Sequence, residues 1–330
     1  MTTAKASTRD IVTGCCVTST CQRVWATALL FCLLVALGGA GCGPTFDPAS
    51  QIETTRVLGA RVTVGTDTPS RATPLPGETA AVTWLVTGRT PPGAQGWAFA
   101  LCQPALSGDL TCGGAPYAVY QGSDPQPVVP VAVPGADVLG KASSVLLYGR
   151  ICDGAAPTFD PQSGLPGCAR GAAGTTAAGP IGVGGADPNH NPTADRGITL
   201  DGQPWPALDP GAEPCLVGPL LTAGTKDHLV DLVTAGGDRE SYTTTFGDPP
   251  VSTASREALQ LSPFATAGKF KSTFAFVDAD DPADAPVAEV KWDAPEAKDV
   301  SGATPVTFTF VVRDDRGGTD WTTRAACVTP

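Results

Sequence analysis

Residues 306–313 read VTFTFVVR, and no other stretch of the chain indicates its fold class so clearly. The run alternates strictly at first and is then continuously apolar, a pattern that predicts a β-strand. Three further runs have the same apolar, β-rich character: TAAVTWLV at 79–86, WAFALC at 97–102 and SVLLYGRIC at 144–152. These stretches predict that the protein is built from strands.

Composition supports this prediction. The 330 residues include 39 Gly and 32 Pro, and neither residue is tolerated inside helices, so a mostly helical protein is excluded. Short β-rich runs about 8 to 20 residues apart, separated by Gly and Pro, are typical of a β-sandwich. Further strands are predicted at 56–64, 117–120, 128–133, 196–200, 216–221, 228–233, 242–246, 269–278 and 288–292. One segment, SREALQL at 255–261, instead predicts a short helix or helical turn capped by Ser255.

A change in composition divides the chain. Residues 153–192 are rich in Gly, Pro and Ala, contain few large apolar side chains and end in GADPNHNP. We place a boundary near Asp187, since two domains of about 140 residues each fit the usual domain size. The prediction is an all-β protein with two sandwich domains in tandem, at 51–187 and 188–330, preceded by a tether at 42–50.

Residues 1–41 are predicted to be an export signal. This segment has a charge of +2, because it contains Lys5, Arg9 and Arg23 and one acidic residue, Asp10. Residues 24–37 form an apolar run. Fourteen helical residues span about 21 Å, which is too short for a hydrocarbon core of about 30 Å. A basic flank, a short apolar run and small residues are typical of a signal peptide.

The motif Gly39-Ala40-Gly41-Cys42 resembles the lipobox of bacterial lipoproteins, although that family usually has Leu where this chain has Gly39. The resemblance implies that Cys42 becomes the mature N-terminus, carries acyl chains such as palmitate and anchors the protein to the cell envelope. The residue after the cysteine is Gly43 rather than Asp. The resemblance therefore implies transport to the outer membrane, if the cell has one. The alternative is cleavage after Ala40 without lipid.

The cysteine count favours lipidation. Of 11 cysteines, Cys15, Cys16, Cys21 and Cys32 leave with the signal, and six remain beyond Cys42. Six can close three disulfides in an oxidising compartment with no thiol left over. Proximity along the chain favours the pairs Cys102–Cys112 and Cys152–Cys168, which leaves Cys215 to pair with Cys327 in the second domain. Pairing of Cys102 with Cys152 and of Cys112 with Cys168 is the alternative.

Three short motifs resemble bacterial immunoglobulin-like and cadherin-like modules. They are Asp314-Asp315-Arg316-Gly317-Gly318 after the last strand, Asp187-Pro188-Asn189-His190-Asn191-Pro192 and Asp238-Arg239-Glu240. The resemblance implies immunoglobulin-like domains and calcium candidates at Asp187, Asn189 and Asn191, with His190 where an acidic ligand is expected. The acidic loop at 278–284 offers a second set of calcium candidates, Asp278, Asp280 and Asp281. A solvated loop is the alternative for this segment.

No catalytic or cofactor-binding residues are predicted. The two histidines, His190 and His228, lie in no catalytic motif. We expect His190 to be a turn residue and His228 to be a strand-edge residue. GADVLGK at 135–141 fits a phosphate loop only up to its lysine, because Ala142 replaces the magnesium-binding hydroxyl. It is predicted to be a turn. The net charge of −11, or −13 without the signal's +2, argues against nucleic acid as a partner.

The sequence therefore predicts a lipid-anchored envelope protein without enzymatic activity, acting in display, adhesion or structure, with a membrane and an envelope protein or glycan as partners. The alternative is a carbohydrate-binding or glycan-processing surface module. That alternative requires exposed tryptophans or a carboxylate pair in one groove, whereas strand patterns favour burial of the mature chain's tryptophans. These are Trp84, Trp97, Trp205, Trp292 and Trp321.

Overall fold

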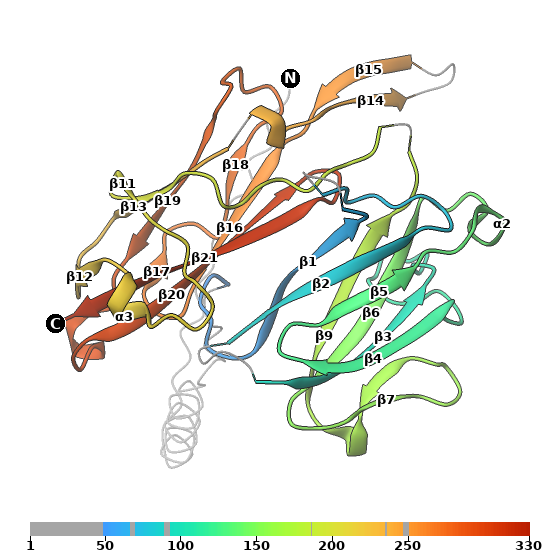
Figure 1. Ribbon diagram of the computed structural model, residues 1–330, viewed down its shortest axis with the longest axis horizontal. Helices are drawn as coiled ribbons and strands as arrows, with labels where there is room; N and C mark the ends of the chain where they lie inside the picture. The colour runs from blue at the N-terminus through green and yellow to red at the C-terminus, as the bar shows by residue number, and fades with distance from the viewer. Residues whose placement is uncertain (1–48, 67–69, 89–92, 186, 235, 247–250) are drawn as a thin grey trace, which may run out of the picture. The chain divides into compact units, whose positions relative to one another are not determined.

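The computed structural model describes residues 49–66, 70–88, 93–185, 187–234, 236–246 and 251–330 (Figure 1). The signal and Cys42 lie outside the described residues. Residues 47–330 belong to one compact unit. Within the described part of the chain, no helix is long and apolar enough to cross a membrane.

The first sandwich packs a sheet of order β1-β2-β5 against a sheet of order β4-β3-β6-β9. Its strands are β1 (Arg56–Val64), β2 (Thr79–Thr87), β3 (Gln95–Cys102), β4 (Ala118–Asp124), β5 (Val128–Ala132), β6 (Ser144–Cys152) and β9 (Gly174–Gly182). Alternate apolar residues of both sheets form the core, in which Trp84 stacks on Phe99 with ring centroids 5.1 Å apart. A short helix, α2 (Ala136–Leu139), and a small hairpin, β7 (Pro157–Phe159) and β8 (Pro166–Cys168), lie between these strands in the chain.

The second sandwich packs sheets of order β11-β10-β13-β19-β17 and β12-β21-β20-β16-β18. Its strands are β10 (Ile198–Leu200), β11 (Gln203–Pro204), β12 (Leu220–Thr222), β13 (His228–Val233), β16 (Leu259–Ala265), β17 (Lys269–Phe270), β18 (Ala275–Val277), β19 (Val287–Asp293), β20 (Thr304–Asp314) and β21 (Thr319–Thr329). Its separate core contains Trp205, Trp292 and Phe308. A two-stranded hairpin, β14 (Ser241–Phe246) and β15 (Val251–Arg256), completes an all-β architecture of two sandwiches in tandem, as predicted.

The pattern VTFTFVVR follows from the position of β20. Val306, Phe308, Phe310 and Val312 face the core of the second sandwich, which accounts for the alternation. Val311 points the other way, yet it is fully buried because it packs against Leu58 and Leu85 of the first sandwich. The continuous part of the run is therefore the part covered on both faces.

We call this apolar contact between the sandwiches the seam; it comprises Ile52, Leu58, Leu85, Val311, Phe264 and Trp321. The segment that precedes β1 takes part in it. The Ile52 N–H donates to Ala265 O at 2.8 Å, and the Ala265 N–H donates to Ser50 O at 2.9 Å. Residues at the start of the first predicted domain thus pair with β16 of the second sandwich.

Strand β9 was not predicted, because its sequence GTTAAGPIG contains few β-branched or aromatic residues. It nevertheless pairs with β6 along all nine residues and buries Ala177 and Ile181. Pro180 is tolerated because β9 is the edge strand of its sheet, where a missing N–H interrupts no second ladder. The Gly/Pro/Ala-rich stretch therefore supplies the last strand of the first sandwich.

Three predicted elements are wrong, one of them the strand at 269–278, which is interrupted between β17 and β18. Residues 255–261 are not helical: β15 ends at Arg256, β16 begins at Leu259, and Glu257, Leu259 and Leu261 are buried with a period of two. Residues 216–221 are not one strand, because a helical turn, α3 (Pro214–Val217), precedes β12. Pro214 at its first turn favours this start. Segment 135–141 contains the one-turn helix α2, and strand β6 follows as expected.

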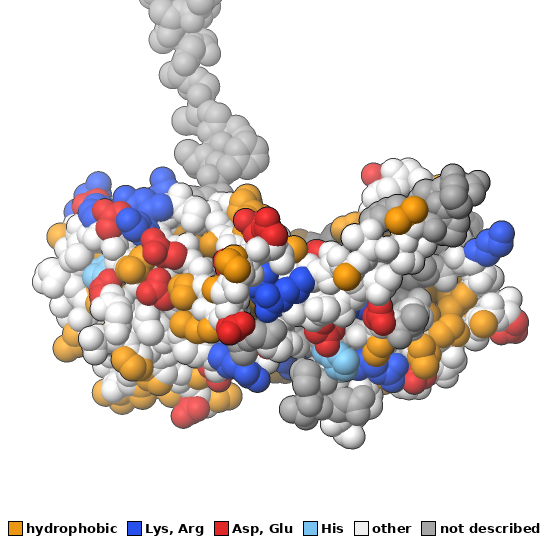
Figure 2. All heavy atoms as spheres, turned by 90° about the horizontal axis from the view of Figure 1, so that it is seen from above, with side chains coloured by type: hydrophobic (Ala, Val, Ile, Leu, Met, Phe, Trp, Pro, Cys, Tyr) orange, Lys and Arg blue, Asp and Glu red, His pale blue; other side chains and the backbone are white. Residues whose placement is uncertain are grey.

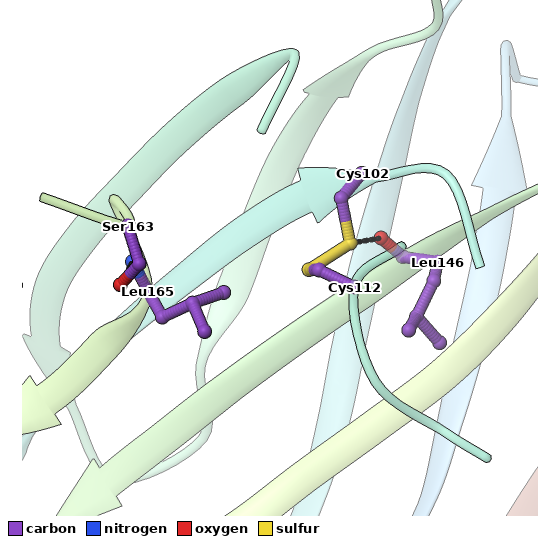
Figure 3. The surroundings of a disulfide bond; sticks show 5 residues. All are labelled: Cys102, Cys112, Leu146, Ser163 and Leu165. Atoms are coloured by element: carbon purple, nitrogen blue, oxygen red, sulfur yellow. Dashed lines mark hydrogen bonds between the residues drawn. A yellow bond between two sulfur atoms is a disulfide. The ribbon is translucent and has the colours of Figure 1, made fainter. Parts of the chain in front are cut away.

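The six cysteines beyond Cys42 form the disulfides that the sequence favoured: Cys102–Cys112, Cys152–Cys168 and Cys215–Cys327. The Cα atoms of the last pair lie 4.6 Å apart, so α3 is tied to β21. Figure 3 shows that the Cys102–Cys112 bridge lies beside β6, with Cys102 Sγ 3.7 Å from Leu146 O. Disulfides of this kind are typical of exported proteins.

Candidate functional site

A cluster of polar side chains, here called the polar junction, gathers the linker residues, Glu240 and the turn between β20 and β21. Its members are Asn189, His190, Asn191, Glu240, Glu257, Asp314 and Arg316. The sequence pointed to most of these segments through three separate motifs. This convergence of predicted segments makes the polar junction the candidate site.

Asn191 acts as a bridge between the sandwiches. Its Nδ2 donates to Val62 O at 2.7 Å and to Ser70 O at 3.1 Å, in the first sandwich. Its Oδ1 accepts a hydrogen bond at 2.9 Å from the Thr319 N–H in the second. With its amide engaged on both sides, Asn191 has a structural role in this arrangement.

The neighbouring linker residues contact the second sandwich. Asn189 Nδ2 donates to both carboxylate oxygens of Asp314 at 3.2 Å, whereas the buried Asn189 Oδ1 has no hydrogen-bond partner. Both the backbone N–H and the ring Nδ1 of His190 contact Glu240, at 3.1 and 2.6 Å. Asp187 lies at the exposed end, where its carboxylate accepts a hydrogen bond from the Thr243 N–H.

Glu257, which the sequence did not identify as a site residue, is fully buried within this junction. Its carboxylate accepts from the Glu240 N–H at 2.9 Å and lies 3.1 Å from Arg316 Nη1. Burial raises the pKa of Glu257 from its ordinary 4.5 to about 7. Burial also raises the pKa of Asp314, although the Gly318 and Arg316 N–H groups donate to its carboxylate.

Two arginines contact the segments in which calcium ligands were predicted. Arg239, only 2% exposed, donates to the backbone carbonyls of Asp278, Ala279 and Asp281 and so holds the acidic loop. Arg316 donates to the backbone oxygen of Asp187. Among the described residues, no group of three or more His, Cys, Asp or Glu side chains is arranged to hold a metal. Calcium binding stays an untested prediction.

The other histidine lies apart from this junction. His228 begins β13, and its Nδ1 is 2.7 Å from Asp201 Oδ2, while its Nε2 is buried without a partner. Its ring lies 5.7 Å from that of Trp292. The pair packs against the second core, and the position at the start of a strand agrees with the expectation.

The tryptophans are mainly core residues, as predicted. Trp84, Trp97, Trp205 and Trp292 are buried, and Trp321 is half-buried beneath the guanidinium of Arg61. The exposed aromatic pair is instead Phe274 and Phe276, with ring centroids 5.1 Å apart beside and within edge strand β18. The sequence did not reveal this pair, because residues 269–278 predict one continuous strand rather than the two short strands β17 and β18.

Comparison of the chain with protein-family models and with curated proteins finds no match. Among solved structures, it is similar to the two tandem V-type regions of VCBP3, a v-region-containing chitin binding protein. The two chains are 8% identical, and the similarity covers 85% of this chain and 100% of that one, with a TM-score of 0.22. A score this low carries no argument about fold or function, so the assignment of two sandwiches rests on the strands themselves.

Proposed function

We propose that this protein is a lipid-anchored component of the cell envelope that acts without catalysis, as a rigid display or adhesion module. The observation that carries the proposal is the seam, which fixes two sandwiches against each other. A rigid pair of domains holds surface loops in a constant arrangement, which suits recognition of a partner.

Polar contacts reinforce the seam on either side of its apolar residues. Arg61 forms an ion pair with Asp320, with the two groups 16 to 35% exposed, and its guanidinium also covers the Trp321 ring at 4.8 Å. Arg313 donates to Leu58 O across the same contact. These directional contacts fix the orientation of one sandwich against the other, while the desolvation of their charged groups offsets part of the energy gained.

The surface offers several features for contact with a partner. Acidic and basic side chains are interspersed on the face shown in Figure 2, and hydrophobic side chains gather there in small groups. The hairpin of β14 and β15 presents Ser and Thr side chains, several of them exposed. The Phe274–Phe276 pair favours a second candidate, glycan binding, since exposed aromatic rings can pack against sugar rings.

Lipid anchoring is tested by labelling cells that express the full chain with an alkyne analogue of palmitate. We expect label on the wild type and none on Cys42→Ser, which should also keep its signal. Normal processing of the wild type without label would contradict the anchor.

Binding is tested separately, by applying the purified protein to a glycan array. Binding that Phe276→Ala abolishes, and that the control Val287→Ala at an exposed position of β19 retains, would support the glycan candidate. Absence of such binding leaves display of a protein-binding surface as the proposed role.

A further inference from the structure

A cavity of about 360 Å³ lies beside the seam, between the two sheets of the first sandwich and the hairpin of β20 and β21. Its walls include Val82 and Trp84 of β2, Ile181 of β9 and Arg313 of β20. The volume is within the range of natural small-molecule sites, about 300 to 1,000 Å³.

Small residues keep this cavity open. β1 and β9 are edge strands of the two facing sheets, and where they approach each other they carry Ala60 and Gly179. A Cβ atom on Gly179 would lie 3.3 Å from Trp84 Cη2 and 3.8 Å from Ala60 Cβ, so any larger residue there would occupy the cavity. A Cβ on Gly59 would likewise approach Arg313 Nη2, at 3.5 Å.

Arg313 gives the cavity an uncompensated positive charge. It donates to Ser262 Oγ at 3.2 Å and to Leu58 O, and within the described part of the chain it forms no ion pair with a carboxylate. Burial lowers the pKa of its guanidinium, which is the expected effect when no anion offsets the loss of water. Other arginines of the structure do have carboxylate partners: Arg61, Arg71, Arg316 and Arg324.

We propose that this cavity binds a small amphipathic carboxylate. The carboxylate pairs with the free N–H groups of Arg313, since a guanidinium has five donors and two are already used. The apolar part packs against the partly exposed lining residues Val57, Ala60 and Ala178, above the buried core residues. A volume of 360 Å³ holds about a dozen groups the size of water or methylene, so an acid such as octanoate fits.

The experiment titrates the full chain with octanoate, 1-octanol and octylammonium, followed by calorimetry and by tryptophan fluorescence. We expect octanoate to bind and to raise the melting temperature, with octanol weaker by tenfold or more and octylammonium not binding. Arg313→Gln should weaken octanoate binding at least tenfold and leave octanol binding unchanged, because it removes the charge-assisted hydrogen bonds.

A steric variant tests the same site without touching the charge. Gly179→Val should abolish octanoate binding, whereas the matched control Gly182→Val on the same strand should not, because a Cβ at Gly182 meets nothing within 4 Å. Equal binding of all three ligands, octanoate binding that survives Gly179→Val, or no octanoate binding at millimolar concentration would each overturn the proposal. Should Arg313→Gln fail to fold, the glycine pair decides.

Discussion

At the scale of single residues, the buried carboxylate of Glu257 dominates the chemistry of the polar junction. A carboxyl group whose pKa is higher in the folded than in the unfolded state binds its proton more tightly when folded. The folded state is therefore favoured while the group is protonated, and this advantage is lost as the pH rises from about 4.5 to about 7.

We predict that Glu257→Gln removes this pH dependence. Glutamine resembles the protonated acid, so the variant should be more stable than the wild type at pH 8, by about 3 kcal/mol at most, and nearly equal to it at pH 4.5. Urea unfolding at both pH values measures the difference. The control is Glu296→Gln at an exposed ion pair, where no gain at pH 8 is expected. A constant difference across the range would contradict the role given to Glu257.

The sequence could reveal only part of this junction. Asp187, Asn189 and Glu240 were found through short motifs that resemble known modules. Arg316 also lay in one of these motifs, but Glu257 did not, and nothing in the sequence indicated that the two would pair, because they are 59 positions apart. The fold creates the contact, so only the structure shows it.

At the scale of elements, runs such as VTFTFVVR and SVLLYGRIC were predictable because both are rich in the apolar, β-branched and aromatic residues that buried strands require. Strand β9 was not, since an edge strand needs only a few buried side chains and this one uses Ala177 and Ile181. The segment 255–261 was misread because its burial alternates over too few residues to stand out from a helical pattern.

The disulfide between α3 and β21 should contribute most among the three bridges. In the chain-entropy model, its separation of 112 residues corresponds to about 5 kcal/mol of stability, against about 3 kcal/mol for the ten-residue separation of Cys102 and Cys112. We therefore expect the Cys215→Ser/Cys327→Ser variant to lose more stability than Cys102→Ser/Cys112→Ser. Guanidinium unfolding of both variants provides the test, and the reverse order would show that local strain or denatured-state structure dominates.

At the scale of the whole molecule, the seam should hold the two sandwiches together without being needed for either core. Val311→Asp places an unpaired carboxylate in the apolar contact, which is costly. We predict a larger radius of gyration by small-angle scattering, with two separate thermal transitions. Val287→Asp, at an exposed position, is the control and should change neither. A variant that stays compact would show that the polar contacts suffice.

Chelation of divalent metal ions tests whether the stability of the whole molecule depends on calcium. Because Arg239 and Arg316 already hold the carbonyls of the acidic loop and the linker, we expect EDTA to leave the melting temperature within about 5 °C of its value without chelator. Differential scanning calorimetry with and without added calcium measures this. A larger decrease, restored by calcium, would establish the calcium site that the linker motif suggests.

The pairing of Ile52 with Ala265 determines how the molecule would carry mechanical load. Under the proposed anchoring, tension from the membrane would reach the described part of the chain at Ser50 to Ile52, where it pairs with Ala265. The bridge between Gln51 and Ala265 is parallel, and Ile52 is fully buried, so the pull is resisted by β16 before it reaches β1. The anchored end of the chain would therefore be attached where the two domains meet. A shear force on the protein would then act on both domains about this one attachment point.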